Sequence, residues 1–304
     1  MGAILVLLLS AAAWAGEDPV AYAARRADLG RKFSAQWRHL LKSLPELAEH
    51  HRFVESRPRV DLRFPAPGDG FSEHTVAIYE EGLVRVNRRW LAAGGAALEA
   101  KGVPYARVPE ILAWKALPVL VHELRHGINS VEMRAELGRV CDNFIVEEEA
   151  VAYRDQTAAL KALLARGKPA FHEALYVDAD RVSFSVLRAW DAGPGEFMED
   201  VRARNEGKLS ALTSTRAELL EAAASLLDDS RANLAAWRSK DPEARARLLK
   251  ELGPNAEARS AELVRHNEDC AAIFSDPELY GRWRRFFSER VEAFAEDWDA
   301  ERGR

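Results

Sequence analysis

The chain is poor in cysteine, has no strong excess of charge of one sign, and has no long hydrophobic run beyond its first fifteen residues. Two cysteines in 304 residues exclude a disulfide-stapled miniprotein and a zinc module built from cysteines. With 43 basic and 48 acidic side chains, the net charge of −5 gives no electrostatic reason to expect a nucleic-acid partner. No later stretch approaches the roughly 20 apolar residues of a transmembrane helix, so we expect no transmembrane segment in the mature chain. The composition that is present, 48% hydrophobic and 30% charged, is typical of a protein with a packed core.

Residues 1–15, MGAILVLLLSAAAWA, are typical of an export signal. The apolar run is short for a membrane span, and its final A-W-A is a small-x-small pattern that predicts cleavage after Ala15. An uncleaved anchor and a buried first helix are the alternatives. We expect export to the periplasm or out of the cell, where Cys141 and Cys270 can pair as a disulfide in an oxidising compartment. Two buried free thiols are the alternative, because the sequence does not give their separation.

Hydrophobic periodicity divides the rest of the chain into three parts: an N-terminal helical segment (16–57), a core (58–165) and a helical C-terminal region (166–304). Within the core, three short segments bounded by turn residues predict strands, and a Glu-Glu-Gly turn joins the last two as a hairpin. The predicted strands are Val60–Phe64, Thr75–Tyr79 and Leu83–Asn87. We therefore expect an α+β fold that is mostly helical, with a small antiparallel sheet before the helices of the core.

Two of the expected helices carry the residues of chemical interest. Pro118 is well placed as the first-turn proline of a helix that runs to about Ile128. Asp142 is a candidate N-cap, with its neighbour Asn143, for a helix from Phe144 to about Leu164.

The first of these helices contains the motif H-E-x-x-H, formed by His122, Glu123 and His126. Histidines four residues apart on a helix lie on one face, near enough for both imidazoles to bind one Zn²⁺. Glu123 follows the first histidine, where its carboxylate can take a proton from an activated water. Five apolar residues before His122 predict a buried helix, in which unpaired imidazoles would be costly. A buried histidine pair without a metal is the alternative interpretation.

A zinc site needs a third protein ligand, and the sequence offers two arrangements. In the pattern HExxHxxGxxH the ligand follows on the same chain segment, but Asn129 and Glu132 stand at the glycine and histidine positions. The other arrangement takes a glutamate from the next helix, where three glutamates follow one another. At 100° per residue, Glu149 falls within the apolar face of that helix, whereas Glu147 and Glu148 are expected to be solvated. We predict Glu149 as the third ligand, with Glu147 or Glu148 as alternatives.

These residues resemble the metal site of gluzincin-type zinc metallopeptidases. In that family HExxH on one helix is completed by an ExxA- or ExxD-like glutamate on the next, and here Glu149 begins the sequence EAVA. The resemblance covers roughly residues 60–165 and implies a zincin-like core, in which an edge strand lines a cleft and pairs with extended peptide substrate. Well-known members carry Asp four residues after the Glu ligand, where this chain has Tyr153. The orientation of the histidines is therefore unexplained, and Tyr153 becomes a candidate oxyanion stabiliser.

The sequence thus predicts an exported zinc-dependent peptidase that acts on a peptide or protein substrate. His122, His126 and Glu149 would hold Zn²⁺, and Glu123 would act as the general base. The main alternative is a non-catalytic helical binding or scaffold protein on a zincin-like fold, with a structural or vestigial metal; hydrolysis of a non-peptide amide is another. Arg125 is expected to help end or anchor its helix. The remaining histidines are expected to be surface or packing residues: His39, His50, His51, His74, His172 and His266.

Overall fold

The computed structural model describes seven stretches of the chain, with the residues between them left out. These stretches are 18–56, 60–65, 75–80, 83–142, 144–166, 181–252 and 256–303. The predicted signal peptide lies outside the described residues, as do Asn143, His74 and His172. None of the described helices combines the length and apolar character that crossing a bilayer requires.

Three strands form one small sheet: β1 (Val60–Arg63), β2 (Ala77–Glu80) and β3 (Leu83–Asn87). Their order is β1-β3-β2, with β1 parallel and β2 antiparallel to β3, so the prediction of a purely antiparallel sheet is wrong. Alternating residues identify strands but not their neighbours. Glu80 pairs with Leu83, so only two residues connect β2 to β3. A connection this short requires the two strands to be antiparallel. The long connection from β1 to β2 lets β3 lie between them.

The N-terminal segment is helical, as predicted. It contains α1 (Pro19–Arg25), α2 (Leu29–Ser43), the 3₁₀ turn η1 (Pro45–Leu47) and α3 (Ala48–Ser56). Apolar residues at three- and four-residue spacing bury one face of α2 and the turn after it: Phe33, Trp37, Leu40, Leu41 and Leu44. After the sheet come α4 (Arg88–Ala100) and the 3₁₀ turn η2 (Tyr105–Arg107).

Helix α5 (Val108–Leu137) is the central element, and it contacts α2, α3, α4, α6 and strands β2 and β3. The sequence predicted a helix that starts at Pro118, but Pro118 lies inside α5. An interior proline costs about 3 kcal/mol of helix stability. Burial of the residues around it offsets that cost, because Leu117, Val119 and Leu120 are all in the core. Gly138, with φ of 72°, ends the helix in the left-handed conformation.

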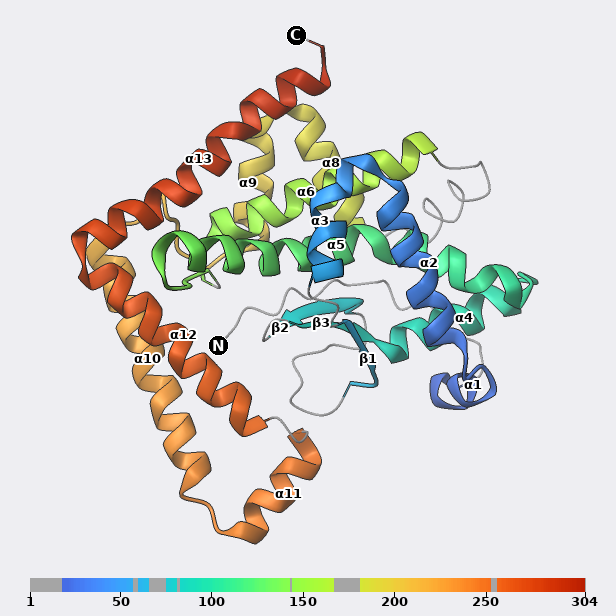
Figure 1. The fold of residues 1–304 in the computed structure, drawn as a ribbon, viewed down its shortest axis with the longest axis horizontal. Helices are drawn as coiled ribbons and strands as arrows, with labels where there is room; N and C mark the ends of the chain where they lie inside the picture. The colour runs from blue at the N-terminus through green and yellow to red at the C-terminus, as the bar shows by residue number, and fades with distance from the viewer. Residues whose placement is uncertain are drawn as a thin grey trace.

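Helix α6 (Val146–Arg166) lies beside α5, above the sheet in the view of Figure 1. It begins two residues after the predicted start. Asp142 does not cap it; its carboxylate instead accepts a hydrogen bond from Ser130 on α5 at 2.6 Å and pairs with His266 at 3.0 Å.

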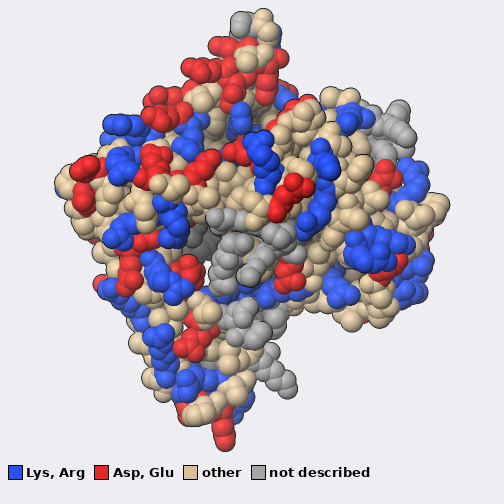
Figure 2. All heavy atoms as spheres, in the orientation of Figure 1, with Lys and Arg blue, Asp and Glu red and all other residues tan. Residues whose placement is uncertain are grey.

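The C-terminal region is helical in its described parts, as expected. Its helices are α8 (Arg181–Ala192), α9 (Pro194–Arg204), α10 (Arg216–Arg238), α11 (Pro242–Leu252), α12 (Ala256–Ser275) and α13 (Pro277–Glu301). Figure 1 shows α10 and α12 as an arm that projects from the body, with α11 at its far end. Helix α13 returns to the body and packs on α5, α6 and α9. On the face in Figure 2, acidic side chains predominate at the free end of α13, and both signs mix elsewhere.

Cys141 and Cys270 form a disulfide, with their Cα atoms 4.8 Å apart. The expected pairing is therefore confirmed over the alternative of free thiols. The bond joins the segment between α5 and α6 to α12. The indole N–H of Trp283 on α13 donates to the carbonyl of Cys141 at 2.8 Å, so α12, α13 and the segment between α5 and α6 meet at this point.

Candidate metal centre

Two histidines of α5 and one glutamate of α6 come together in the structure. One ligand atom from each of His122, His126 and Glu149 can be chosen so that all three lie within 4.8 Å of one another. His122 Nε2 and Glu149 Oε2 are 3.4 Å apart. Ligand atoms of a tetrahedral zinc site lie about 3.3 Å apart, given zinc–ligand distances of about 2.0–2.1 Å. The spacing of this pair therefore suits a small divalent metal.

The helix geometry places the two imidazoles as the motif predicts. The ring centroids of His122 and His126 are 4.8 Å apart, and the rings are nearly perpendicular. Residues four apart on a helix lie one turn apart on the same face, which explains the approach. The ring of Tyr153 on α6 packs edge-on against His122, with the centroids 4.6 Å apart.

One oxygen of Glu149 supports the idea that a cation belongs here. Glu149 Oε1 accepts a hydrogen bond from the ammonium of Lys208 at 2.7 Å. Glu149 Oε2 is buried and has no hydrogen-bond partner among the described residues, and the same holds for His122 Nδ1. A buried carboxylate oxygen without a partner is costly. Although burial favours the neutral acid, His122, Lys208 and His126 hold the pKa of Glu149 well below its usual value.

The prediction that Glu147 and Glu148 are solvated is wrong. They are 0% and 2% exposed, because α6 is covered on several sides in its first turn. Glu147 accepts hydrogen bonds from Ser210 Oγ at 2.5 Å and from the backbone N–H of Ala211 at 2.7 Å. The helical phase singled out Glu149, but it did not reveal that Glu148 also contacts α5 or that residues 210–211 cover Glu147. Of the three glutamates, Glu149 is the one in the cluster.

Glu148 supplies the contact that the sequence left unexplained. Its carboxylate accepts the hydrogen bond of His126 Nδ1, so the other ring nitrogen, Nε2, is the one that can face a metal. Burial opposes the charge on this imidazole, but Glu148, and more weakly Glu149, raise the pKa of His126 to about 10. Gluzincin-type peptidases carry the supporting aspartate four residues after the ligand; in this chain the carboxylate that contacts His126 belongs to the residue just before Glu149.

Glu123 lies between the cluster and the sheet. Its Oε2 accepts a hydrogen bond from the backbone N–H of Tyr79 at 2.7 Å, and Tyr79 belongs to β2, one of the two outer strands of the described sheet. Burial raises the pKa of Glu123, and the neighbouring His122 and His126 oppose that rise. The carboxylate is therefore held in place beside the two histidines by the main chain of the edge strand.

Among the described residues, no third ligand follows the two histidines on α5 itself. Glu132, at the position of a third histidine, pairs with Arg290 of α13 at 2.9 Å. Asn129, at the position of the glycine, is fully buried. Neither belongs to the cluster of possible ligands found among the described residues.

Arg125 does not end its helix, which continues to Leu137, but it anchors the helix through an ion network centred on the buried Asp155. Its guanidinium pairs with Asp155 on α6 and with Glu49 on α3. His50 Nε2 lies 3.0 Å from the same Asp155 carboxylate and is buried, so it is a packing residue, as predicted. Arg154 adds a second guanidinium, 2.9 Å from Asp155. The network joins α3, α5 and α6 next to the cluster without contributing a residue to it.

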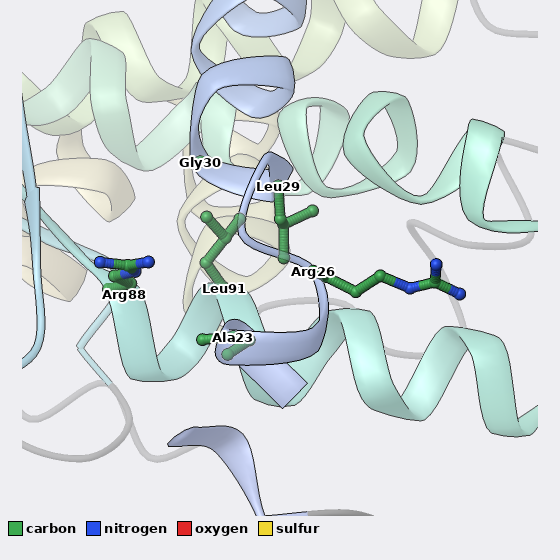
Figure 3. A pocket seen from close by; sticks show the side chains of 7 residues that line it. Ala23, Arg26, Leu29, Gly30, Arg88 and Leu91 are labelled. Carbon is green, nitrogen blue, oxygen red and sulfur yellow. The ribbon is translucent and has the colours of Figure 1, made fainter. Parts of the chain in front are cut away.

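A small pocket elsewhere in the molecule is unrelated to this site. It lies where α1 and α2 meet α4, and its lining includes Ala23, Leu29, Arg88 and Leu91 (Figure 3). None of its lining residues belongs to the metal-ligand cluster.

The sequence did not assign three contacts at this site: Tyr79 with Glu123, Glu148 with His126, and Lys208 with Glu149. The contact of Glu148 could have been suspected from the sequence, since Glu148 is the residue just before Glu149. Tyr79 was placed in a strand, but its contact depends on the packing of that strand against α5. Lys208 is 59 residues from Glu149, and no local pattern connects the two.

The comparisons with known proteins add nothing to this picture: no family model, curated protein or solved structure matches the chain.

Proposed function

We propose that the protein is a zinc-dependent peptidase. The observation that carries the proposal is the orphaned Oε2 of Glu149, which lies 3.4 Å from His122 Nε2. Glu123 stands next to these groups on a fixed backbone contact. A purely structural metal site has no use for a carboxylate held beside two of its ligands.

The residues present fit zinc. His122 and His126 would bind through Nε2 and Glu149 through Oε2, a two-histidine, one-carboxylate set that leaves a coordination position open. Other first-row metals also bind to two histidines and one carboxylate, so the assignment of zinc belongs to the proposal. Zinc supplies Lewis acidity toward a carbonyl oxygen and toward water when it is bound in such a site.

Glu123 has the proton-transfer role. Its Oε2 is engaged by the N–H of Tyr79, so we assign proton uptake from the attacking water to Oε1. The same atom then delivers that proton to the leaving amine. Burial, which raises the pKa of Glu123, makes it a stronger base than an exposed glutamate.

The position of β2 supports a peptide as the substrate. Val76, just before β2, accepts a hydrogen bond from Asn87 at 2.9 Å, so in this antiparallel register Tyr79 directs its N–H away from β3 and toward Glu123. An outer strand beside a hydrolytic site is suited to align an extended chain by main-chain hydrogen bonds. The disulfide fits the proposed export, because such bonds persist mainly in oxidising compartments.

Replacement of one carboxylate tests this proposal. Glu123→Gln removes the base and leaves the ligands, so peptide hydrolysis should fall by about 10²- to 10⁴-fold while bound zinc stays at the wild-type level. Peptide-library cleavage, read by mass spectrometry with and without a chelator, measures the activity. Glu132→Gln, the same change on the same helix at the ion pair with Arg290, is the matched control.

Chelator-sensitive cleavage that is absent in Glu123→Gln and present in Glu132→Gln is the expected pattern. A wild-type protein that holds zinc but cleaves no peptide would favour the non-catalytic binding protein instead. Cleavage that survives in Glu123→Gln would contradict the role of that residue.

A further inference from the structure

Lys208 reaches the cluster from the C-terminal region. It lies between α9 and α10, and its ammonium donates to Glu149 Oε1 at 2.7 Å. The side chain of Lys208 is 9% exposed and that of Glu149 is 12% exposed, so this ion pair is largely shielded from water.

Backbone hydrogen bonds just after Lys208 fix the position from which its side chain extends. Leu209 forms a parallel bridge with Ile145: the N–H of Val146 donates to Leu209 O at 2.9 Å, and the N–H of Leu209 donates to Phe144 O at 3.0 Å. Two residues further on, Ala211 donates its N–H to the buried carboxylate of Glu147. The segment is therefore attached to the start of α6 immediately after Lys208, and its position relative to Glu149 is built into the fold.

We propose that Lys208 is a positioning residue of the metal centre that makes Glu149 a one-oxygen ligand. A carboxylate can bind a metal through one or both oxygens. With Oε1 engaged by Lys208, only the orphaned Oε2 faces His122. One-oxygen binding keeps a coordination position open for water and substrate. This inference rests on the proposed metal site.

The number of oxygens that Glu149 contributes can be measured directly. Co²⁺ in place of zinc reports its coordination number, because its visible absorption is several times stronger in a four-coordinate than in a more highly coordinated site. X-ray absorption of the zinc-loaded wild-type protein gives the same information without a substitution. Both measurements report on the bound metal itself rather than on catalysis.

Lys208→Met removes the ammonium with little change in volume. We expect its Co²⁺ absorption to fall severalfold below that of the wild type, as Oε1 of Glu149 enters the coordination sphere. Lys161→Met is the matched control, because Lys161 of α6 pairs with Glu301 at the same 2.7 Å distance, away from the cluster. Its Co²⁺ spectrum should equal that of the wild type.

A Lys208→Met spectrum identical to the wild-type spectrum would overturn the positioning role, and so would an equal loss in Lys161→Met. If Lys208→Met does not fold, the zinc-loaded wild type decides: both Glu149 oxygens at bonding distance would overturn the proposal, and one oxygen supports it. A wild-type protein that takes up neither metal would overturn the proposed function as well. Metal uptake with two-oxygen binding would overturn the role of Lys208 alone.

Discussion

Three consecutive carboxylates at the start of α6 have three different partners. Glu147 accepts from Ser210 and Ala211, Glu148 accepts from His126, and Glu149 lies between His122 and Lys208. Successive helical side chains point about 100° apart, so each meets a different neighbour in a buried first turn. Every one of these charges needs a partner, because burial without one is costly.

Glu148 should affect metal binding without being a ligand. Its contact with His126 Nδ1 sets the tautomer and the direction of Nε2. We expect Glu148→Gln to lower zinc affinity by about 10- to 100-fold, measured by competition with a chromophoric chelator. Glu147→Gln is the matched control and should keep wild-type affinity, since Glu147 contacts the segment at residues 210–211 instead. Equal zinc affinity in the wild type, Glu148→Gln and Glu147→Gln would contradict a role of Glu148 in metal binding.

At the scale of elements, the ion pair between Arg125 and Asp155 joins α5 to α6 and involves none of the proposed ligands. Asp155 lies nearly two turns after Glu149 and faces Arg125, Arg154 and His50. This buried carboxylate therefore neutralises two guanidiniums, from α5 and α6, and contacts the imidazole of His50 on α3.

Loss of that charge should destabilise the fold. Asp155→Asn leaves the buried guanidinium of Arg125 and the half-buried one of Arg154 without their shared counter-ion, and we expect the free energy of unfolding at neutral pH to fall by about 3 kcal/mol or more in chemical denaturation. Asp191→Asn, at an exposed ion pair with Lys161, should cost less than about 1 kcal/mol. Equal effects of the two substitutions would contradict the structural role given to Asp155.

The difference between wild type and Asp155→Asn should also depend on pH. Although burial favours the neutral acid, His50, Arg125 and Arg154 hold the pKa of Asp155 well below its usual value. The stabilisation is therefore present above the unfolded-state pKa of about 3.9, and it is lost as the pH falls from there toward the lowered folded-state value. Denaturation at several pH values should show the difference shrinking on the acid side.

Local sequence patterns predicted some of the helices and strands and missed features that depend on tertiary packing. The helical face of α2, the span of β3 and the start of α6 within two residues were all predictable, because they depend on side chains that are near one another in the chain. The passage of α5 through Pro118 was not, since packing around Leu117 and Leu120 decides it. The parallel pairing of β1 with β3 was missed for the same reason: it depends on distant residues.

At the scale of the whole molecule, the site draws on four parts of the chain. Tyr79 comes from the sheet, the HExxH residues from α5, Glu148 and Glu149 from α6, and Lys208 from the C-terminal region. The HExxH motif predicted the residues of α5, the phase of the next helix predicted Glu149, and the disulfide was expected from the two cysteines. The contribution of Lys208 had no local signal, because a contact across 59 residues depends on the tertiary fold.

The central claim is that His122, His126 and Glu149 form a metal site. The most direct measurement is the metal content of the purified protein and of Glu149→Ala, determined by mass spectrometry of the elements, with Glu147→Ala as the neighbouring control. We predict one zinc per chain in the wild type, the same in folded Glu147→Ala, and none in folded Glu149→Ala. Stoichiometric zinc in Glu149→Ala, or no bound metal in the wild type, would contradict the account.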